Sequence, residues 1–200
     1  MAETRPRERR RQRVRRAFVD AARKIAAEQG PEGLSLRGVA QKTDYSHAAL
    51  YEYFQNREEL LGAVISEGLC ELHATLAAVS TDRPPGERLR DMGLAYIAFA
   101  RRAPEIFELI FTRTRAPRRR VADARGTDTL YGLLRTSVAA LVPDASERAV
   151  DRAAYAFWAL VHGLAMLEMT FLRDFEADFE TARRVSIEQF IKTLPHTVRE

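Results

Sequence analysis

Apolar residues recur every three to four positions along almost the whole chain, which is the spacing of an amphipathic helix. Sustained alternation with a period of two, which would indicate strands, is missing, and the sequence contains no Asn-Gly hairpin turn. Glycine and proline interrupt the helical pattern repeatedly. The pattern therefore predicts an all-α protein with helices at about 10–29, 35–43, 46–53, 57–79, 86–102, 104–114, 127–142, 145–173 and 178–194.

The first four predicted helices form one unit, and the first three of them share a core. Each carries an apolar stripe at helical spacing, and helices this short are not stable alone. We therefore expect the stripes to be buried against one another. Their members are Phe18, Ala21, Ala22, Ile25 and Ala26 in the first helix, Leu36, Val39 and Ala40 in the second, and Leu50, Tyr51 and Phe54 in the third.

The segment 43–46 has the length of the turn in a helix-turn-helix motif. Such a turn usually contains a residue with positive φ, most often glycine. Asp44 occupies that place here, and Asp is one of the few other residues enriched in this conformation. Ser35 and Ser46 are suited to cap the two helices beside the turn, and Asn56 with Glu59 resembles a capping box at the next helix.

Two segments, LSLRGVA at 34–40 and YSHAALYEYFQNREELL at 45–61, resemble the DNA-binding signature of the TetR family of bacterial transcriptional regulators. The resemblance covers about residues 16–65. Two positions depart from the usual pattern, because Asp44 replaces a turn glycine and Arg57 replaces a common lysine. The resemblance implies a repressor that binds a palindromic double-stranded DNA operator as a homodimer and is released by a small-molecule effector.

A recognition helix of about eight residues is roughly 12 Å long and fits the major groove of DNA with its N-terminal end toward the bases. His47 would then meet a purine acceptor, and Ala48 a thymine methyl. The resemblance implies phosphate contacts elsewhere, although Tyr51 is equally well interpreted as a packing residue and Arg57 as a surface charge. The predicted DNA-binding residues are Ser35, Arg37, Ser46, His47, Ala48, Tyr51, Tyr53 and Arg57.

Charge is concentrated at the N-terminus. Residues 1–16 contain eight arginines and two glutamates, a net charge of +6, whereas the whole chain carries +4. A basic arm on a nearly neutral body is typical of nucleic-acid binding, with a solvated disordered tail as the alternative. The predicted organisation is a basic flexible arm at 1–15, a helix-turn-helix domain at 16–62, and a helical bundle for ligand binding and dimerisation at 63–200.

The C-terminal half is rich in aromatic residues, which are core residues by default but also line ligand cavities between helices. The stretches 96–107 and 158–164 resemble the C-terminal domain of a TetR subgroup known by its Trp and His-Gly residues. We predict a pocket for a small, largely apolar ligand, with His162 alternatively a core histidine bonded to a backbone carbonyl or a carboxylate. The predicted lining residues are Tyr96, Phe99, Phe107, Phe111, Trp158 and His162.

The last two predicted helices carry more apolar positions than one inward stripe requires. The family resemblance implies that these helices pair with those of a second subunit across a two-fold axis. The predicted dimer interface consists of Phe157, Val161, Leu164, Ala165, Phe190, Ile191 and Leu194.

Several other classes of protein have little support. The single cysteine, Cys70, cannot form an intramolecular disulfide, no run approaches the roughly 18 apolar residues of a membrane span, and the Arg-rich N-terminus lacks the apolar segment of a secretory signal. Metal-ligand spacing, a nucleophile elbow and a phosphate loop are missing. We therefore expect a bacterial cytoplasmic protein that is not an enzyme and has no cofactor. The alternatives are a helical ligand-binding or scaffold protein without DNA binding, or a small helical enzyme using His162.

Overall fold

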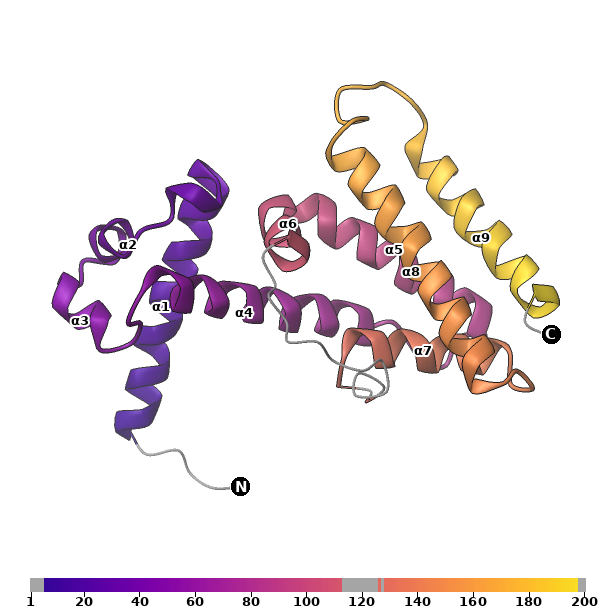
Figure 1. Cartoon of the computed structure of the whole chain (residues 1–200), viewed down its shortest axis with the longest axis horizontal. Helices are drawn as coiled ribbons and strands as arrows, with labels where there is room; N and C mark the ends of the chain where they lie inside the picture. Colours follow the sequence, from indigo (N-terminus) through magenta and orange to yellow (C-terminus); the bar gives the residue numbers. More distant parts are fainter. Residues whose placement is uncertain (1–5, 113–125, 127, 198–200) are drawn as a thin grey trace. The chain divides into compact units, whose positions relative to one another are not determined.

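The computed structural model describes residues 6–112, 126 and 128–197, and this part of the chain is helical without strands, which confirms the predicted all-α class (Figure 1). Its elements are α1 (Pro6–Gln29), η1 (Pro31–Gly33), α2 (Leu36–Thr43), α3 (His47–Tyr51), α4 (Arg57–Ala77), α5 (Pro85–Arg102), α6 (Pro104–Thr112), α7 (Leu130–Leu141), α8 (Glu147–Met169) and α9 (Phe179–Thr197). Three helices differ clearly from their predicted ranges. α8 ends at Met169 rather than at 173. α3 has five residues, and α1 begins at Pro6, so residues 6–15 are helical rather than a flexible arm.

The chain divides into two compact units. The first contains α1, α2, α3, the first part of α4 and most of α6; the second contains the end of α4 with α5, α7, α8 and α9. The division falls within α4, after Leu69, whereas the expected boundary lay at residue 62. Residues 1–5 of the predicted arm lie outside the described part of the chain.

The first unit is built as the apolar pattern predicts. Phe18, Val39, Leu50 and Phe54 are fully buried, so the stripes of α1, α2 and α3 meet in one core. Gly68 allows α6 to lie directly on α4, because a Cβ added there would be 2.5 Å from Cγ2 of Ile106. Tyr51 is the exception among the stripe residues, since its side chain is largely exposed.

In the second unit α5 packs against α7, α8 and α9. Gly93 brings α5 close to α8, since an added Cβ would lie 3.0 Å from Cζ of Phe157 and 3.1 Å from Cγ1 of Val161. A buried ion pair, 2.6 Å between Arg183 and Glu168, ties α9 to the end of α8.

Among the described helices, α4 is long and apolar enough by composition alone to cross a membrane, and 44% of its most apolar stretch is buried within the fold. Core helices of soluble proteins share this property.

Candidate nucleic-acid interface and apolar cavity

The turn between α2 and α3 has the geometry that its sequence predicts. Asp44 ends α2 in the left-handed conformation, with φ 55° and ψ 21°, and it is the one non-glycine residue with positive φ in the described part of the chain. The side-chain oxygen of Ser46 accepts a hydrogen bond from the amide of Ala49 at 3.1 Å, and that of Ser35 accepts one from the amide of Gly38, also at 3.1 Å. Both predicted N-caps are confirmed. Each hydroxyl keeps its own proton for donation to another acceptor.

α3 presents most of its surface to solvent. Leu50 anchors it in the core, while Ser46, His47 and Ala48 at its N-terminal end are exposed. The Tyr51 side chain is 48% exposed and lies edge-on to the ring of His47, with 4.9 Å between ring centroids. Four of the residues expected to meet DNA, Ser46, His47, Ala48 and Tyr51, are therefore accessible on or directly before α3.

The N-terminal part of α1 carries arginines beside α3. Arg7, Arg10 and Arg11 line an open groove of about 480 Å³ together with side chains from the α2–α3 region, which are those of Tyr45, Ala49, Glu52 and Tyr53. The guanidinium of Arg11 lies 5.9 Å from the centroid of the Tyr53 ring, and that of Arg15 lies 5.0 Å from the centroid of Phe54. Tyr53 is half-buried, with its ring 5.4 Å from that of Phe18. The helical form of α1 thus holds a basic surface at a fixed place next to α3.

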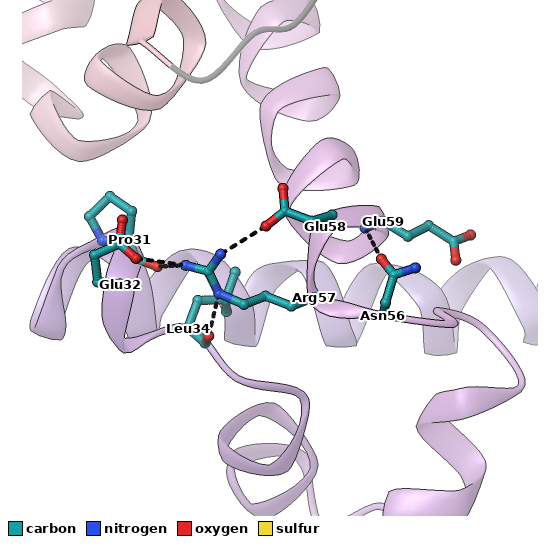
Figure 2. Close-up of polar contacts among 7 residues, drawn as sticks. All are labelled: Pro31, Glu32, Leu34, Asn56, Arg57, Glu58 and Glu59. Carbon is teal, nitrogen blue, oxygen red and sulfur yellow. Dashed lines mark hydrogen bonds and ion pairs between the residues drawn. The ribbon is translucent and has the colours of Figure 1, made fainter.

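Arg57, predicted as a phosphate contact, points into its own fold (Figure 2). Nε donates to the backbone carbonyl of Leu34 at 2.9 Å, and Nη2 donates to that of Pro31 at 2.7 Å. One half of the predicted Asn56–Glu59 capping box is present, since Asn56 Oδ1 accepts from the amide of Glu59 at 2.9 Å. The Glu59 carboxylate accepts its hydrogen bond from the amide of Gln55, at 2.7 Å, rather than from that of Asn56.

An apolar cavity of about 40 Å³ lies in the second unit. Its walls come from the end of α4 and from α5, α7 and α8, and they consist of Leu76, Met92, Gly93, Tyr96, Leu130, Tyr131, Leu134, Phe157, Trp158 and Val161. Tyr96 and Trp158 were predicted to line a pocket. The α7 residues were not, although Leu130 and Leu134 carry the helical spacing that could have indicated them.

Other predicted lining residues lie elsewhere. Phe99 is fully buried in the core, outside the cavity walls. Phe107 and Phe111 belong to α6 in the first unit, where their rings pack against each other with centroids 4.8 Å apart. Neither phenylalanine is among the residues that line the cavity.

Three polar side chains form a short hydrogen-bonded chain beside the cavity. The indole nitrogen of Trp158 donates to the hydroxyl of Tyr96 at 3.2 Å, and the same hydroxyl lies 2.9 Å from Nδ1 of His162. Burial lowers the pKa of His162 and raises the pKa of Tyr96, so both groups are held neutral. The Tyr96 hydroxyl and Nδ1 of His162 therefore share a hydrogen bond between two neutral groups. His162 is thus hydrogen-bonded to a tyrosine side chain.

The predicted dimer residues are mostly internal. Phe157, Val161, Ala165 and Leu194 are buried within the subunit, and Phe157 and Val161 line the cavity. Leu164, Phe190 and Ile191 are half-buried.

The exposed apolar face of α8 is a different row, at four-residue spacing, which the sequence could have indicated: Tyr155, Ala159, Gly163 and Leu167. Tyr155 is 70% exposed and Leu167 48%, and a Cβ added at Gly163 would meet nothing within 4 Å.

A buried helix-turn-helix core, an exposed α3 beside a basic surface, and a separate helical unit with its own cavity are the architecture of a helix-turn-helix DNA-binding protein with a C-terminal helical domain. Residues 18–64 match the bacterial regulatory proteins of the tetR family, and residues 89–193 match the tetracyclin repressor-like C-terminal domain. The chain belongs to the TetR family of transcriptional regulators, which are DNA-binding proteins and not enzymes.

Similar proteins cover almost the whole chain. An uncharacterized HTH-type transcriptional regulator of Bacillus subtilis (strain 168), YobS, is 24% identical over 181 residues, which are 90% of this chain and 92% of the relative. The structure of a protein with unknown function from Rhodococcus sp. RHA1 is 26% identical with a TM-score of 0.77, covering 91% of this chain and 95% of that one. A TetR variant from Acinetobacter baumannii AYE, in complex with minocycline, shares the fold at 20% identity and a TM-score of 0.65, covering 92% and 97%.

Proposed function

We propose that this protein is a transcriptional repressor of the bacterial cytoplasm that binds a palindromic operator as a homodimer and is released by a small, largely apolar ligand. The observation that carries the proposal is the exposed N-terminal end of α3, held on a buried helix-turn-helix core beside the arginines of α1.

Base contacts would come from the start of α3. The His47 imidazole is placed to meet a purine acceptor, and the Ala48 methyl to meet the methyl of thymine. α3 is only five residues long, so its accessible end spans a few base pairs at most. Specificity would therefore depend on few side chains from each subunit.

Phosphate contacts would surround the end of α3. The Ser35 hydroxyl can donate to a phosphate oxygen while it caps α2, and Arg37 is exposed in the first turn of α2. Tyr51 and Tyr53 offer hydroxyl donors near α3. The α1 arginines that line the groove, Arg7, Arg10 and Arg11, would add charge that attracts DNA of any sequence.

Dimerisation would use the exposed row on α8. Ala159 and Gly163 are small and lie between the larger Tyr155 and Leu167, so two antiparallel copies of this ridge can approach closely around a two-fold axis. Val185 on α9 is 41% exposed and would extend the interface. Two recognition helices about one turn of DNA apart then match a palindrome.

The ligand would enter the cavity beside Tyr96 and Trp158. At about 40 Å³ this cavity is far below the roughly 300–1,000 Å³ of typical ligand sites, so its lining side chains must move apart to admit a ligand. Such a movement would couple binding to α4, which forms one wall at Leu76 and continues into the helix-turn-helix unit. A hundred-fold loss of operator affinity needs only about 2.7 kcal/mol of differential binding.

Selection of duplexes from a randomised pool by the purified protein tests the proposal. A repressor of this kind enriches a near-palindrome, and a dimer with roughly 6–10 phosphate contacts shows a log–log slope of affinity against salt of about −5 to −9. If no duplex is enriched and the affinity for DNA does not change with salt concentration, the alternative of a helical ligand-binding or scaffold protein is favoured.

A further inference from the structure

The guanidinium of Arg57 joins the first residue of α4 to the segment that leads into α2. Nε and Nη2 donate to the carbonyls of Leu34 and Pro31, and Nη1 lies 3.0 Å from a carboxylate oxygen of Glu58 (Figure 2). The carboxylate of Glu32 lies 3.4 Å from Nη2. All three guanidinium nitrogens are therefore engaged within the protein.

The two carbonyls belong to the segment that leads directly into α2. Leu34 is buried and directly precedes Ser35, the N-cap of α2. Pro31 begins η1, the short turn that carries the chain from α1 to α2. Holding both carbonyls therefore determines where the N-terminal end of α2 lies, and with it Ser35 and Arg37.

A DNA phosphate would find this guanidinium hard to reach. It would have to displace two backbone carbonyls, and it would meet the negative charges of Glu32 and Glu58 on either side. Like charges this close oppose an incoming anion. The planar fork of arginine also explains the residue type, because Nε and Nη2 can hold two acceptors at fixed angles, whereas a lysine ammonium is a single point charge.

We propose that Arg57 is a positioning residue for DNA binding rather than a phosphate contact: it fastens the start of α2 to the start of α4. The inference rests on the proposed DNA-binding function. It also means that a movement of the first turn of α4 reaches Ser35 directly, through two hydrogen bonds, instead of through the intervening chain.

The experiment compares Arg57→Lys and Arg57→Gln with the wild type on a duplex that the wild type enriches from a randomised pool. Both variants should bind roughly 10- to 100-fold more weakly, since charged hydrogen bonds are lost in both, while the salt slope stays at the wild-type value. Arg37→Gln, which removes an exposed candidate phosphate contact in each subunit, should reduce the slope by about 2 as the matched control.

Amide hydrogen exchange distinguishes positioning from a general loss of stability. The Gly38 amide is capped by Ser35 on α2, and the Ala49 amide by Ser46 on α3, at the same 3.1 Å. In both Arg57 variants exchange at Gly38 should accelerate at least about ten-fold while exchange at Ala49 stays unchanged. A merely destabilised domain would accelerate both equally.

Two results would overturn the inference. One is an Arg57→Lys variant that binds like the wild type while Arg57→Gln loses affinity together with part of the salt slope, which is the behaviour of a phosphate contact. The other is equal acceleration of exchange at Gly38 and Ala49. If the wild type enriches no duplex, the proposed function fails instead, and the exchange measurement alone decides whether Arg57 fastens α2.

Discussion

Asp44 shows how one residue can meet a backbone requirement that glycine usually meets. Its φ of 55° lies in the left-handed region, where a side chain costs energy unless it is short and polar. Because the core residues on both sides depend on this turn, its conformation is imposed on whichever residue occupies it.

Substitution at Asp44 should therefore follow backbone preference and not charge. Asp44→Gly should change the free energy of unfolding by less than about 1 kcal/mol, because glycine adopts positive φ freely but loses more entropy on folding. Asp44→Val should lower it by about 1–2 kcal/mol, since a β-branched residue tolerates this region poorly. Urea unfolding of the three proteins measures both values, and equal stabilities for the Gly and Val variants would contradict the account.

His162 should make the protein sensitive to acid. Burial lowers its pKa, so the unfolded chain takes up a proton at a higher pH than the folded chain does. The free energy of unfolding should thus fall as the pH decreases below the ordinary histidine value of 6.5, because the unfolded chain binds the proton while the folded chain does not.

Comparison with His162→Gln isolates this histidine from the carboxylates, which titrate in both proteins. Between pH 7 and pH 5 the free energy of unfolding, measured with urea at each pH, should decrease more for the wild type than for the variant. Parallel losses would mean that the His162 imidazole is already free to take up a proton in the folded state.

At the scale of elements, two glycines of α4 differ in how closely a neighbouring helix packs on them. A Cβ at Gly68 would lie 2.5 Å from Ile106 and 3.2 Å from Ile110 of α6, while one at Gly62 would meet nothing within 4 Å. The two residues therefore form a matched pair within one helix.

Gly68→Ala should lower the free energy of unfolding by about 1–3 kcal/mol, because the methyl group forces α6 away from α4. Gly62→Ala should raise it by roughly 0.5–1 kcal/mol, because alanine is the better helix former. Thermal or urea unfolding of both variants tests the contrast, and changes of the same sign in both would show that α6 does not pack on α4 at Gly68.

Helix ends were predictable from the sequence because they depend on local chemistry. Ser35, Ser46 and the Asn56–Glu59 box cap their helices through atoms only a few residues away, and Asp44 is constrained by its own backbone. The length of α3 was overestimated because the apolar pattern continues to Phe54. That side chain is fully buried, but the residue lies after the end of the helix.

Side-chain roles that depend on distant partners were not predictable in this way. α8 is apolar on two faces, and the sequence alone does not tell that Phe157 faces the cavity while Leu167 faces solvent. The same holds for Arg57, whose acceptors Pro31 and Leu34 are more than twenty residues away. A long apolar side chain is assigned to an interior or an interface only when the neighbouring helices are known.

At the scale of the whole molecule, operator binding should depend on residues far from DNA, because only a two-fold pair of subunits can read both halves of a palindrome. The exposed row on α8 is where that dependence can be tested. Tyr155 and Leu167 lie at its two ends, and both are surface residues whose replacement should change the stability of one subunit by no more than about 0.5 kcal/mol.

Tyr155→Glu and Leu167→Glu should each raise the dimer dissociation constant by at least about 100-fold, because a carboxylate would be buried against its own symmetry mate without a partner. Sedimentation measures the dissociation constant, and binding to the selected duplex should weaken with a salt slope approaching half the wild-type value, as expected for one subunit on one half-site. Asp82→Lys, an exposed charge change in the α4–α5 connection, is the control and should leave the dimer intact. Monomeric variants that retain full affinity and slope would show that each subunit binds DNA independently, and the symmetric arrangement of two α3 helices would then have no role.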